Sequence, residues 1–205
     1  YTEFTDSFVW ESGVVTVRIS VSGDYTLFIN GKYAASNQYG DFEYYKVYDE
    51  IDITKFLKRG KNTIAAIGWY WGIAGMRWNT PEPGMIYEVE NDGKILCAST
   101  AATLCRKSKA YLSGREKKIT SQLGYTFLYD ANAEDNGING EGKDFGKCRE
   151  LERSAKLYKR PVKKHILGEP TEGKIRKIQG GYIIDFGRET VGLCSFSLNL
   201  KKKKS

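Results

Sequence analysis

The amino-acid sequence predicts an all-β protein, a β-sandwich of jelly-roll type. Three observations lead to this fold class. Short segments alternate apolar and polar residues with a period of two, turns rich in Gly, Asn and Asp separate them, and almost no segment has a helical period. The chain has 205 residues, which is long enough to bury a hydrophobic core.

The first predicted strands follow one another closely. In Val14–Val21 the odd positions are Val or Ile, and most of the even ones are polar, which is typical of a half-buried strand. The next strand, Tyr25–Ile29, runs into Asn30-Gly31, a strong signal for a tight hairpin because both turn positions need a positive φ. The hairpin returns through Lys32–Ala35. A further strand is predicted at Lys46–Ile53, which is rich in aromatic and β-branched residues.

A short helical turn and three more strands complete the first hundred residues. The helical turn is predicted at Lys55–Lys58, and Thr54 is placed to cap it. Thr63–Trp69 is apolar in both of its alternating rows, which favours a central strand buried on both faces. Met85–Glu90 and Lys94–Ser99 form a second hairpin through the turn Asn91–Gly93, which carries the Asp-Gly signal.

The second half of the sequence is less regular. Tyr125–Tyr129 alternates aromatic residues and predicts a strand, and the Gly-, Asn- and acid-rich stretch Asp130–Lys147 predicts a loop. Arg149–Tyr158 is compatible with either a strand or a short helix. Tyr182–Phe186 and Leu193–Leu200 are again predicted strands.

Two domains are expected. A jelly-roll domain is assigned to residues 1–165. Pro161 and Pro170 flank a predicted linker, and residues 166–205 hold this linker and the first strands of a second, incomplete β-sandwich. Two strands do not make an independent domain.

Charge is distributed unevenly along the chain. The net charge is +7, but residues 1–100 carry nine basic and 13 acidic side chains, whereas residues 101–205 carry 23 and 12. The terminal run Lys201–Lys204 is interpreted as a solvated tail, and without an RNA-recognition signature we expect no nucleic-acid partner. No apolar run approaches the roughly 18 residues of a membrane-spanning helix, so no membrane partner is expected. The sequence begins at Tyr1 and shows no leader, so the compartment stays open.

Cysteine and histidine usage excludes several kinds of site. The four cysteines, Cys97, Cys105, Cys148 and Cys194, form no C-x-x-C pair and are expected to be plain thiols in sheet positions. His165 is the single histidine, so neither an ordinary zinc site nor a Ser-His-Asp hydrolase is predicted. No phosphate-binding loop is present. We therefore expect no cofactor and no metal.

An acidic segment offers oxygen ligands at alternate positions, in Asp130, Asn132, Glu134 and Asp135. The calcium loop of an EF-hand needs glycine at its sixth position, where this sequence has Asp135. The segment is therefore predicted to be a solvated acidic loop. No pair of carboxylates stands out as the acid and base of a glycosidase, so no catalytic residue is nominated.

The most distinctive local feature is an aromatic segment directly after the predicted central strand. Sugar rings present apolar C–H faces that stack on aromatic rings, while Arg and Asn side chains hydrogen-bond the hydroxyl groups. The segment is thus a candidate carbohydrate site. The alternative, that these rings pack on the core or on a neighbouring domain, stays open. The candidate binding residues are Trp69, Tyr70, Trp71, Arg77, Trp78 and Asn79.

A series of short motifs runs along nearly the whole chain in a fixed order. They are Tyr25–Lys32, Gln38–Asp41, Tyr48–Thr54, Gly60–Ala65 and Trp69–Gly72, followed by Gln122–Tyr125, Tyr129–Ala131, Glu134-Asp135 and Ile184–Gly192. In order and spacing these motifs resemble the N-terminal region of bacterial α-L-rhamnosidases. The earlier motifs are shared by many galactose-binding-like jelly rolls, and the later ones narrow the resemblance to rhamnosidase-like enzymes.

The resemblance implies a function as well as a fold. In that family a galactose-binding-like jelly roll and a second β-sandwich precede an (α/α)₆ barrel, whose carboxylates hydrolyse terminal α-L-rhamnose with inversion. A chain that resembles only the region before the barrel is expected to be truncated and to have no catalytic activity alone. Its implied role is that of a non-catalytic accessory domain. The implied partners are a catalytic domain, in the same or a companion chain, and a rhamnose-containing glycan. The alternative is an autonomous carbohydrate-binding module.

Overall fold

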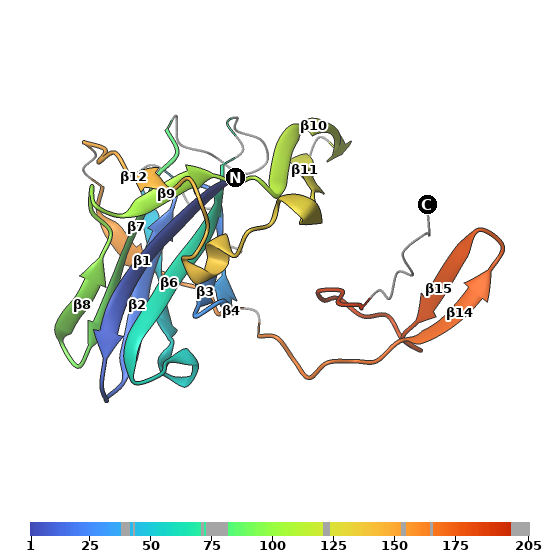
Figure 1. Cartoon of the computed structure of the whole chain (residues 1–205), viewed down its shortest axis with the longest axis horizontal. Coiled ribbons are helices and arrows are strands. Elements are labelled where there is room, and N and C mark those ends of the chain that lie inside the picture. Colours follow the sequence, from blue (N-terminus) through green and yellow to red (C-terminus); the bar gives the residue numbers. More distant parts are fainter. Residues whose placement is uncertain are drawn as a thin grey trace. The chain divides into compact units, whose positions relative to one another are not determined.

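The structure is a computed structural model that describes residues 1–37, 42, 44–70, 72, 82–120, 124–152, 155–164 and 166–197. The chain divides into two compact units, residues 1–164 and residues 165–205. The all-β prediction is confirmed, because strands dominate the described residues (Figure 1). Helical structure in that part is limited to the short 3₁₀ helices η1 (Thr54–Phe56), η2 (Ala131–Ala133) and η3 (Gly137–Asn139). Within the same ranges no helix is long and apolar enough to cross a membrane.

The first unit contains two larger sheets. One has the strand order β12-β9-β1-β6-β3-β4 and the other the order β13-β5-β2-β7-β8. β13 runs parallel to β5, and the other described pairs in these sheets are antiparallel. The strands are β1 (Thr2–Trp10), β2 (Val15–Val21), β3 (Asp24–Ile29), β4 (Lys32–Ser36), β5 (Lys46–Asp52), β6 (Gly60–Trp69), β7 (Met85–Asn91), β8 (Lys94–Ala98), β9 (Leu104–Lys107), β12 (Gly146–Lys147) and β13 (Leu157–Lys159). A separate pair consists of β10 (Tyr111–Thr120) and β11 (Gly124–Tyr129).

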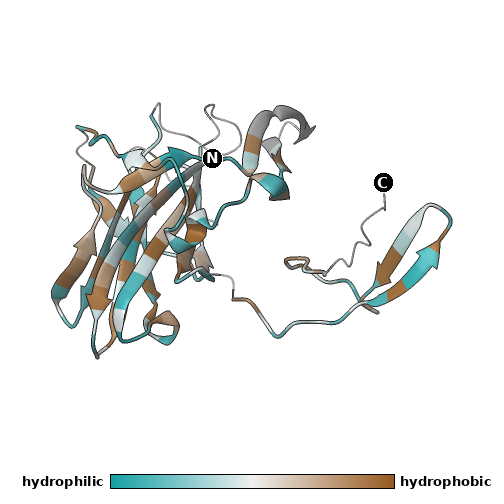
Figure 2. Cartoon of the chain, in the orientation of Figure 1, coloured by the Kyte–Doolittle hydropathy of each residue, from teal (hydrophilic) through white to brown (hydrophobic). Residues whose placement is uncertain are grey.

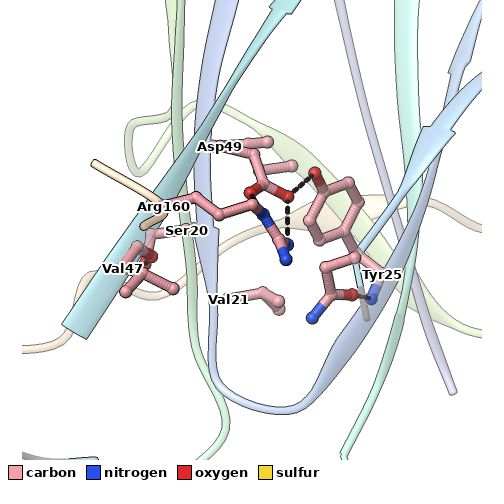
Figure 3. Close-up of a pocket in the computed structure, with 8 residues that line it drawn as sticks. Ser20, Val21, Tyr25, Val47, Asp49 and Arg160 are labelled. Carbon is pink, nitrogen blue, oxygen red and sulfur yellow. Dashed lines mark hydrogen bonds and ion pairs between the residues drawn. The ribbon is translucent and has the colours of Figure 1, made fainter. Parts of the chain in front are cut away.

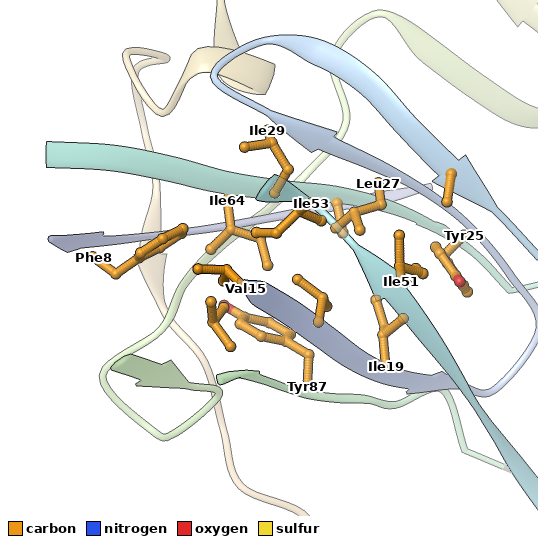
Figure 4. Close-up of a cluster of buried hydrophobic side chains, with 14 residues drawn as sticks. Phe8, Val15, Ile19, Tyr25, Leu27, Ile29, Ile51, Ile53, Ile64 and Tyr87 are labelled. Atoms are coloured by element: carbon orange, nitrogen blue, oxygen red, sulfur yellow. The ribbon is translucent and has the colours of Figure 1, made fainter. Parts of the chain in front are cut away.

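The core lies between the two larger sheets. Apolar and polar residues alternate in bands along their strands (Figure 2), and the inward-facing residues meet in one buried cluster (Figure 4). Burying each large aliphatic side chain contributes about 1.5–3 kcal/mol to folding. The cluster includes Phe8, Leu27, Ile29 and Ile64 from one sheet and Val15, Val17, Ile19, Ile51, Tyr87 and Val89 from the other. This shared core makes the first unit a β-sandwich.

Two predicted hairpins are confirmed by their turns. Asn30 and Gly31 have φ values of 50° and 74° between β3 and β4, and Asp92 and Gly93 have φ values of 48° and 86° between β7 and β8. The two-residue turn with positive φ at both positions matches the twist of the flanking strands, which explains why these sequences turn there.

The central strand is confirmed, but the predicted cap is wrong. β6 pairs with β1 on one side and β3 on the other, and its residues Ile64, Ala65 and Ala66 are buried. Helix η1 has no side-chain cap. The Thr54 hydroxyl instead accepts a hydrogen bond from the backbone N–H of Val15 at 2.9 Å, because η1 lies against the start of β2.

The second unit contains a hairpin of β14 (Lys174–Ile178) and β15 (Gly181–Asp185). The strand predicted at Tyr182–Phe186 is confirmed. The strand predicted at Leu193–Leu200 is wrong for residues 193–197, which pair with no neighbour, and residues 198–200 lie outside the described part. Alternating apolar residues form a strand only when another strand accepts their backbone hydrogen bonds. The assignment of the two units to a jelly roll and to the start of a second sandwich stays a prediction.

Candidate functional site

Trp69, the first of the predicted carbohydrate-binding residues, is half-buried and stacks on another aromatic ring of the chain. Its ring is stacked on that of Tyr1, with centroids 5.4 Å apart and an interplanar angle of 7°. Tyr1 also contacts Tyr111 at 5.4 Å and Phe127 at 6.0 Å, and Tyr111 lies 4.9 Å from Tyr129. These five rings form an aromatic cluster that joins the end of β6 to the pair β10–β11. Trp69 therefore contacts other rings of the chain, and its binding of a sugar stays a prediction.

Of the other predicted binding residues, Tyr70 alone lies in the part of the chain that the structure describes. Tyr70 directly follows β6. Trp71, Arg77, Trp78 and Asn79 lie outside the described residues. Carbohydrate binding by this aromatic segment stays a prediction.

A buried ion cluster centres on Asp49 of β5 (Figure 3). Arg160 donates to both carboxylate oxygens, with 2.9 Å between Nη2 and Oδ2. The Tyr25 hydroxyl donates to Oδ2, and the Nζ of Lys164 lies 3.0 Å from the same oxygen. The side chain of Asp49 is only 2% exposed and that of Arg160 only 8%. One carboxylate thus holds residues from β3 and from the segment after β13.

The surroundings set the protonation states of this cluster. Burial opposes ionisation of Asp49, but hydrogen bonds from Arg160 and Tyr25 outweigh it and keep the pKa of the carboxyl below its usual value. Burial and the nearby Asp49 raise the pKa of Tyr25, so its hydroxyl stays protonated. Burial lowers the pKa of Lys164 despite the attraction of Asp49. The neighbouring cavity has a volume of about 10 Å³, which is room for one water molecule.

A second buried network centres on Arg106 of β9. Its Nε donates to Oε2 of Glu3 at 2.7 Å, and its Nη1 donates to Oδ2 of Asp135 at 2.7 Å. The Ser108 hydroxyl donates to the other oxygen of Glu3, also at 2.7 Å. The hydrogen bond from Arg106 holds the pKa of Asp135 well below its usual range. The prediction of a solvated acidic loop is therefore wrong for Asp135, because its carboxylate anchors the loop to β9.

The rest of the acidic segment is also locally ordered. Asp130 Oδ1 accepts a hydrogen bond from the backbone N–H of Asn132 at 3.0 Å and caps η2. The Tyr129 hydroxyl donates to Glu134. In the ranges that the structure describes, no three His, Cys, Asp or Glu side chains gather as a metal ion requires.

The cysteines form no disulfide, although all four are described. Cys97 lies in β8 and Cys105 in β9, as predicted. Cys148 directly follows β12, and Cys194 is exposed outside any strand.

Sequence reasoning missed both buried networks, the one around Asp49 and the one around Arg106. A usable signal existed for the first, because Asp49 occupies an inward position between Val47 and Ile51, and a buried carboxylate requires a partner. The identity of that partner, 111 residues away, has no local signal. Both networks pair charges between distant segments, which suits them for holding the fold together.

Comparison with known proteins gave matches among solved structures only. No family model matches the sequence, and no curated protein does. A GH78 family rhamnosidase of Bacillus sp. GL1 matches 63% of this chain and 14% of its own, with 26% identity and a TM-score of 0.59. The Streptomyces avermitilis α-L-rhamnosidase, solved with L-rhamnose, matches 91% of this chain and 20% of its own, with 19% identity and a TM-score of 0.63. An α-L-rhamnosidase from Aspergillus terreus matches 91% and 23%, with 17% identity and a TM-score of 0.59.

These matches confirm the predicted resemblance at the level of the fold. They cover most of this chain but at most 23% of each of the three enzymes. The chain therefore spans a small part of the length of the proteins it resembles.

Proposed function

We propose that this chain is a non-catalytic accessory domain of an α-L-rhamnosidase-like glycoside hydrolase and that it supports the catalytic domain. One observation carries the proposal. The shared fold extends over 63–91% of this chain yet corresponds to only 14–23% of the matched rhamnosidases. A region of that size leaves most of such an enzyme, including space for a separate catalytic domain, outside the match.

Two carboxylates of the first unit, Asp49 and Asp135, have contacts that fit a structural role. Glycoside hydrolysis uses two carboxyl groups that face one substrate, and the acid of the pair has a raised pKa. Asp49 and Asp135 have lowered pKa values instead, because arginine side chains hold them. Each of these two carboxylates forms ion pairs and hydrogen bonds within the protein and so links one segment of the chain to another.

A hydrolysis assay tests the proposal directly. The purified chain is incubated with an aryl α-L-rhamnoside, and release of the aryl alcohol is followed by absorbance. We expect the rate of a buffer blank. Turnover that co-purifies with the chain through a second chromatographic step, and disappears on heat unfolding, would contradict the proposal.

The alternative, an autonomous carbohydrate-binding module that uses the aromatic segment, has a separate test. It requires a rhamnose-containing oligosaccharide to change the tryptophan fluorescence, and Trp71→Ala to abolish that change. The stacking of Trp69 on Tyr1 gives this alternative no support, because one face of the ring is already covered.

A further inference from the structure

The outer face of the five-stranded sheet carries a cavity of about 300 Å³. Ligand pockets for small molecules begin at about this size. The cavity extends across the sheet from β13 to β8 and lies on the side opposite the core. Its walls include Arg18, Tyr48, Ile86, Glu88, Ser99 and Leu157.

The polar wall is built around one arginine. Arg18 of β2 lies opposite Glu50 of β5 and Glu88 of β7 in the strand register. Its Nη1 is 2.8 Å from Glu88 Oε1 and 2.5 Å from Glu90 Oε2, and its Nε is 3.4 Å from Glu50 Oε2. Lys159 contacts the other oxygen of Glu50 at 2.8 Å. These ion pairs fix the polar groups before any ligand arrives.

The charges of this wall determine which ligands suit it. Of these ion-paired groups only Arg18 and Glu88 line the cavity, so one cation faces one carboxylate and their charges balance. A wall without net charge offers no overall attraction to a phosphate or a carboxylate. Carboxylate oxygens accept several hydrogen bonds, and their partly exposed positions leave acceptor sites open to hydroxyl donors. The wall therefore suits a neutral ligand rich in hydroxyl groups.

Most of the other residues that line the cavity are apolar or aromatic. Ile86 is 55% exposed and Leu157 is 39% exposed, although the outer face of such a sheet is usually polar. Tyr48 lies on the same wall and is half-buried. An aromatic ring beside exposed aliphatic groups fits a ligand with an apolar face, as the C–H face of a sugar ring provides.

We propose that this cavity is a binding site for a neutral pyranose sugar. Tyr48 packs against the C–H face of the ring, and Arg18 and Glu88 hydrogen-bond its hydroxyl groups. The site uses none of the residues of the aromatic segment after β6. It goes beyond the accessory role proposed above and does not depend on it, because binding and hydrolysis are measured separately.

An NMR titration of the full chain tests this site. The backbone amides are followed while methyl α-L-rhamnopyranoside or methyl β-D-galactopyranoside is added, and D-glucuronate serves as the anionic counterpart. We expect saturable shifts at Arg18, Tyr48 and Glu88 with at least one neutral sugar, with a Kd of about 0.1–10 mM. No saturable shift with either neutral sugar, shifts confined to other residues, or equal binding of glucuronate would each overturn the proposal.

Matched variants distinguish the loss of ring stacking from a general disturbance of the folded structure. Tyr48→Ala is expected to weaken binding at least about tenfold, whereas Tyr48→Phe keeps the ring and stays within about threefold of the parent chain. Tyr182→Ala removes an exposed tyrosine of the second unit and serves as the control. If Tyr48→Ala does not fold, Ile86→Lys, at an exposed position, places a long side chain in the cavity and must weaken binding by a similar factor. Unchanged affinity in the folded cavity variant would overturn the site.

Discussion

Arg160 donates hydrogen bonds to both carboxylate oxygens of Asp49, which lies 111 positions earlier in the sequence. Both residues directly follow the last pair of the parallel pairing of β13 with β5, Lys159 with Tyr48. β13 has only three residues, so it offers little length for backbone pairing. The buried ion pair is therefore a main interaction that holds this edge strand on the sandwich.

Removing the charge of Asp49 is expected to destabilise the first unit strongly. Asp49→Asn leaves the guanidinium of Arg160 buried without its counter-ion, which costs about 3–5 kcal/mol. The free energy of unfolding is measured by urea titration. The control is Glu11→Gln, which breaks an exposed pair with Arg59 and costs less than about 1 kcal/mol. An equal loss of unfolding free energy in the two variants would show that the Asp49 cluster does not stabilise the first unit.

Stability is also expected to fall in acid. The pKa values of Asp49 and Asp135 are lowered by folding, so their contribution is present above the unfolded value of about 3.9 and is lost as the pH drops below it. The melting temperature is recorded from pH 7 to pH 3. Asp135→Asn should melt lower at pH 7 and lose part of the acid dependence, because it no longer takes up a proton on unfolding. Parallel curves for the variant and the parent chain would contradict this assignment.

Two glycines in left-handed backbone conformations should respond differently to substitution. A Cβ at Gly23, where φ is 108°, would lie 2.2 Å from the carbonyl oxygen of Trp69, whereas a Cβ at Gly60, where φ is 90°, meets nothing within 4 Å. Gly60→Ala is thus expected to cost only the backbone strain, about 1–2 kcal/mol. Gly23→Ala adds a collision with backbone and should lower the melting temperature much further. Similar melting temperatures for the two variants would argue against the close approach of the β2–β3 turn to Trp69.

The thiols should differ in reactivity. Burial raises the pKa of Cys97 to about 11, and burial together with a hydrogen bond to Cys105 raises the pKa of Cys148 to about 12. Cys194 is exposed. Because the thiolate is the reacting species, iodoacetamide at pH 8 should modify Cys194 at least about a hundredfold faster than Cys97 or Cys148. Peptide mass spectrometry over time checks the order, and early labelling of Cys148 in folded protein would contradict it.

Local signals account for the parts of the fold that the sequence predicted. The hairpins at Asn30-Gly31 and Asp92-Gly93 follow from the φ values that those residues tolerate. The strand β1 was missed because two of its buried residues are polar, Glu3 and Thr5, which hides the alternation. Glu3 is tolerated inside because Arg106, 103 residues later, pairs with it and Ser108 donates a hydrogen bond to its other oxygen.

The candidate sites likewise depend on contacts between distant residues, for which the sequence has no local signal. The aromatic segment is conspicuous as a sequence, yet Trp69 stacks on Tyr1, which is distant in sequence and lies at the same end of the antiparallel pair β1–β6. The cavity over the outer sheet face combines side chains from β2, β5, β7 and β13. No single stretch of sequence contains that arrangement, because it depends on the order of strands in the sheet.

The late position of β13 has a consequence during synthesis. A nascent chain that has emerged from the ribosome only as far as β8 can form the hairpins of the sandwich, but Asp49 then lacks the cation that arrives with residue 160. Contacts of such long sequence separation give a high contact order, and such topologies fold slowly. The first unit is therefore expected to reach its final packing only after nearly all of its residues have been translated.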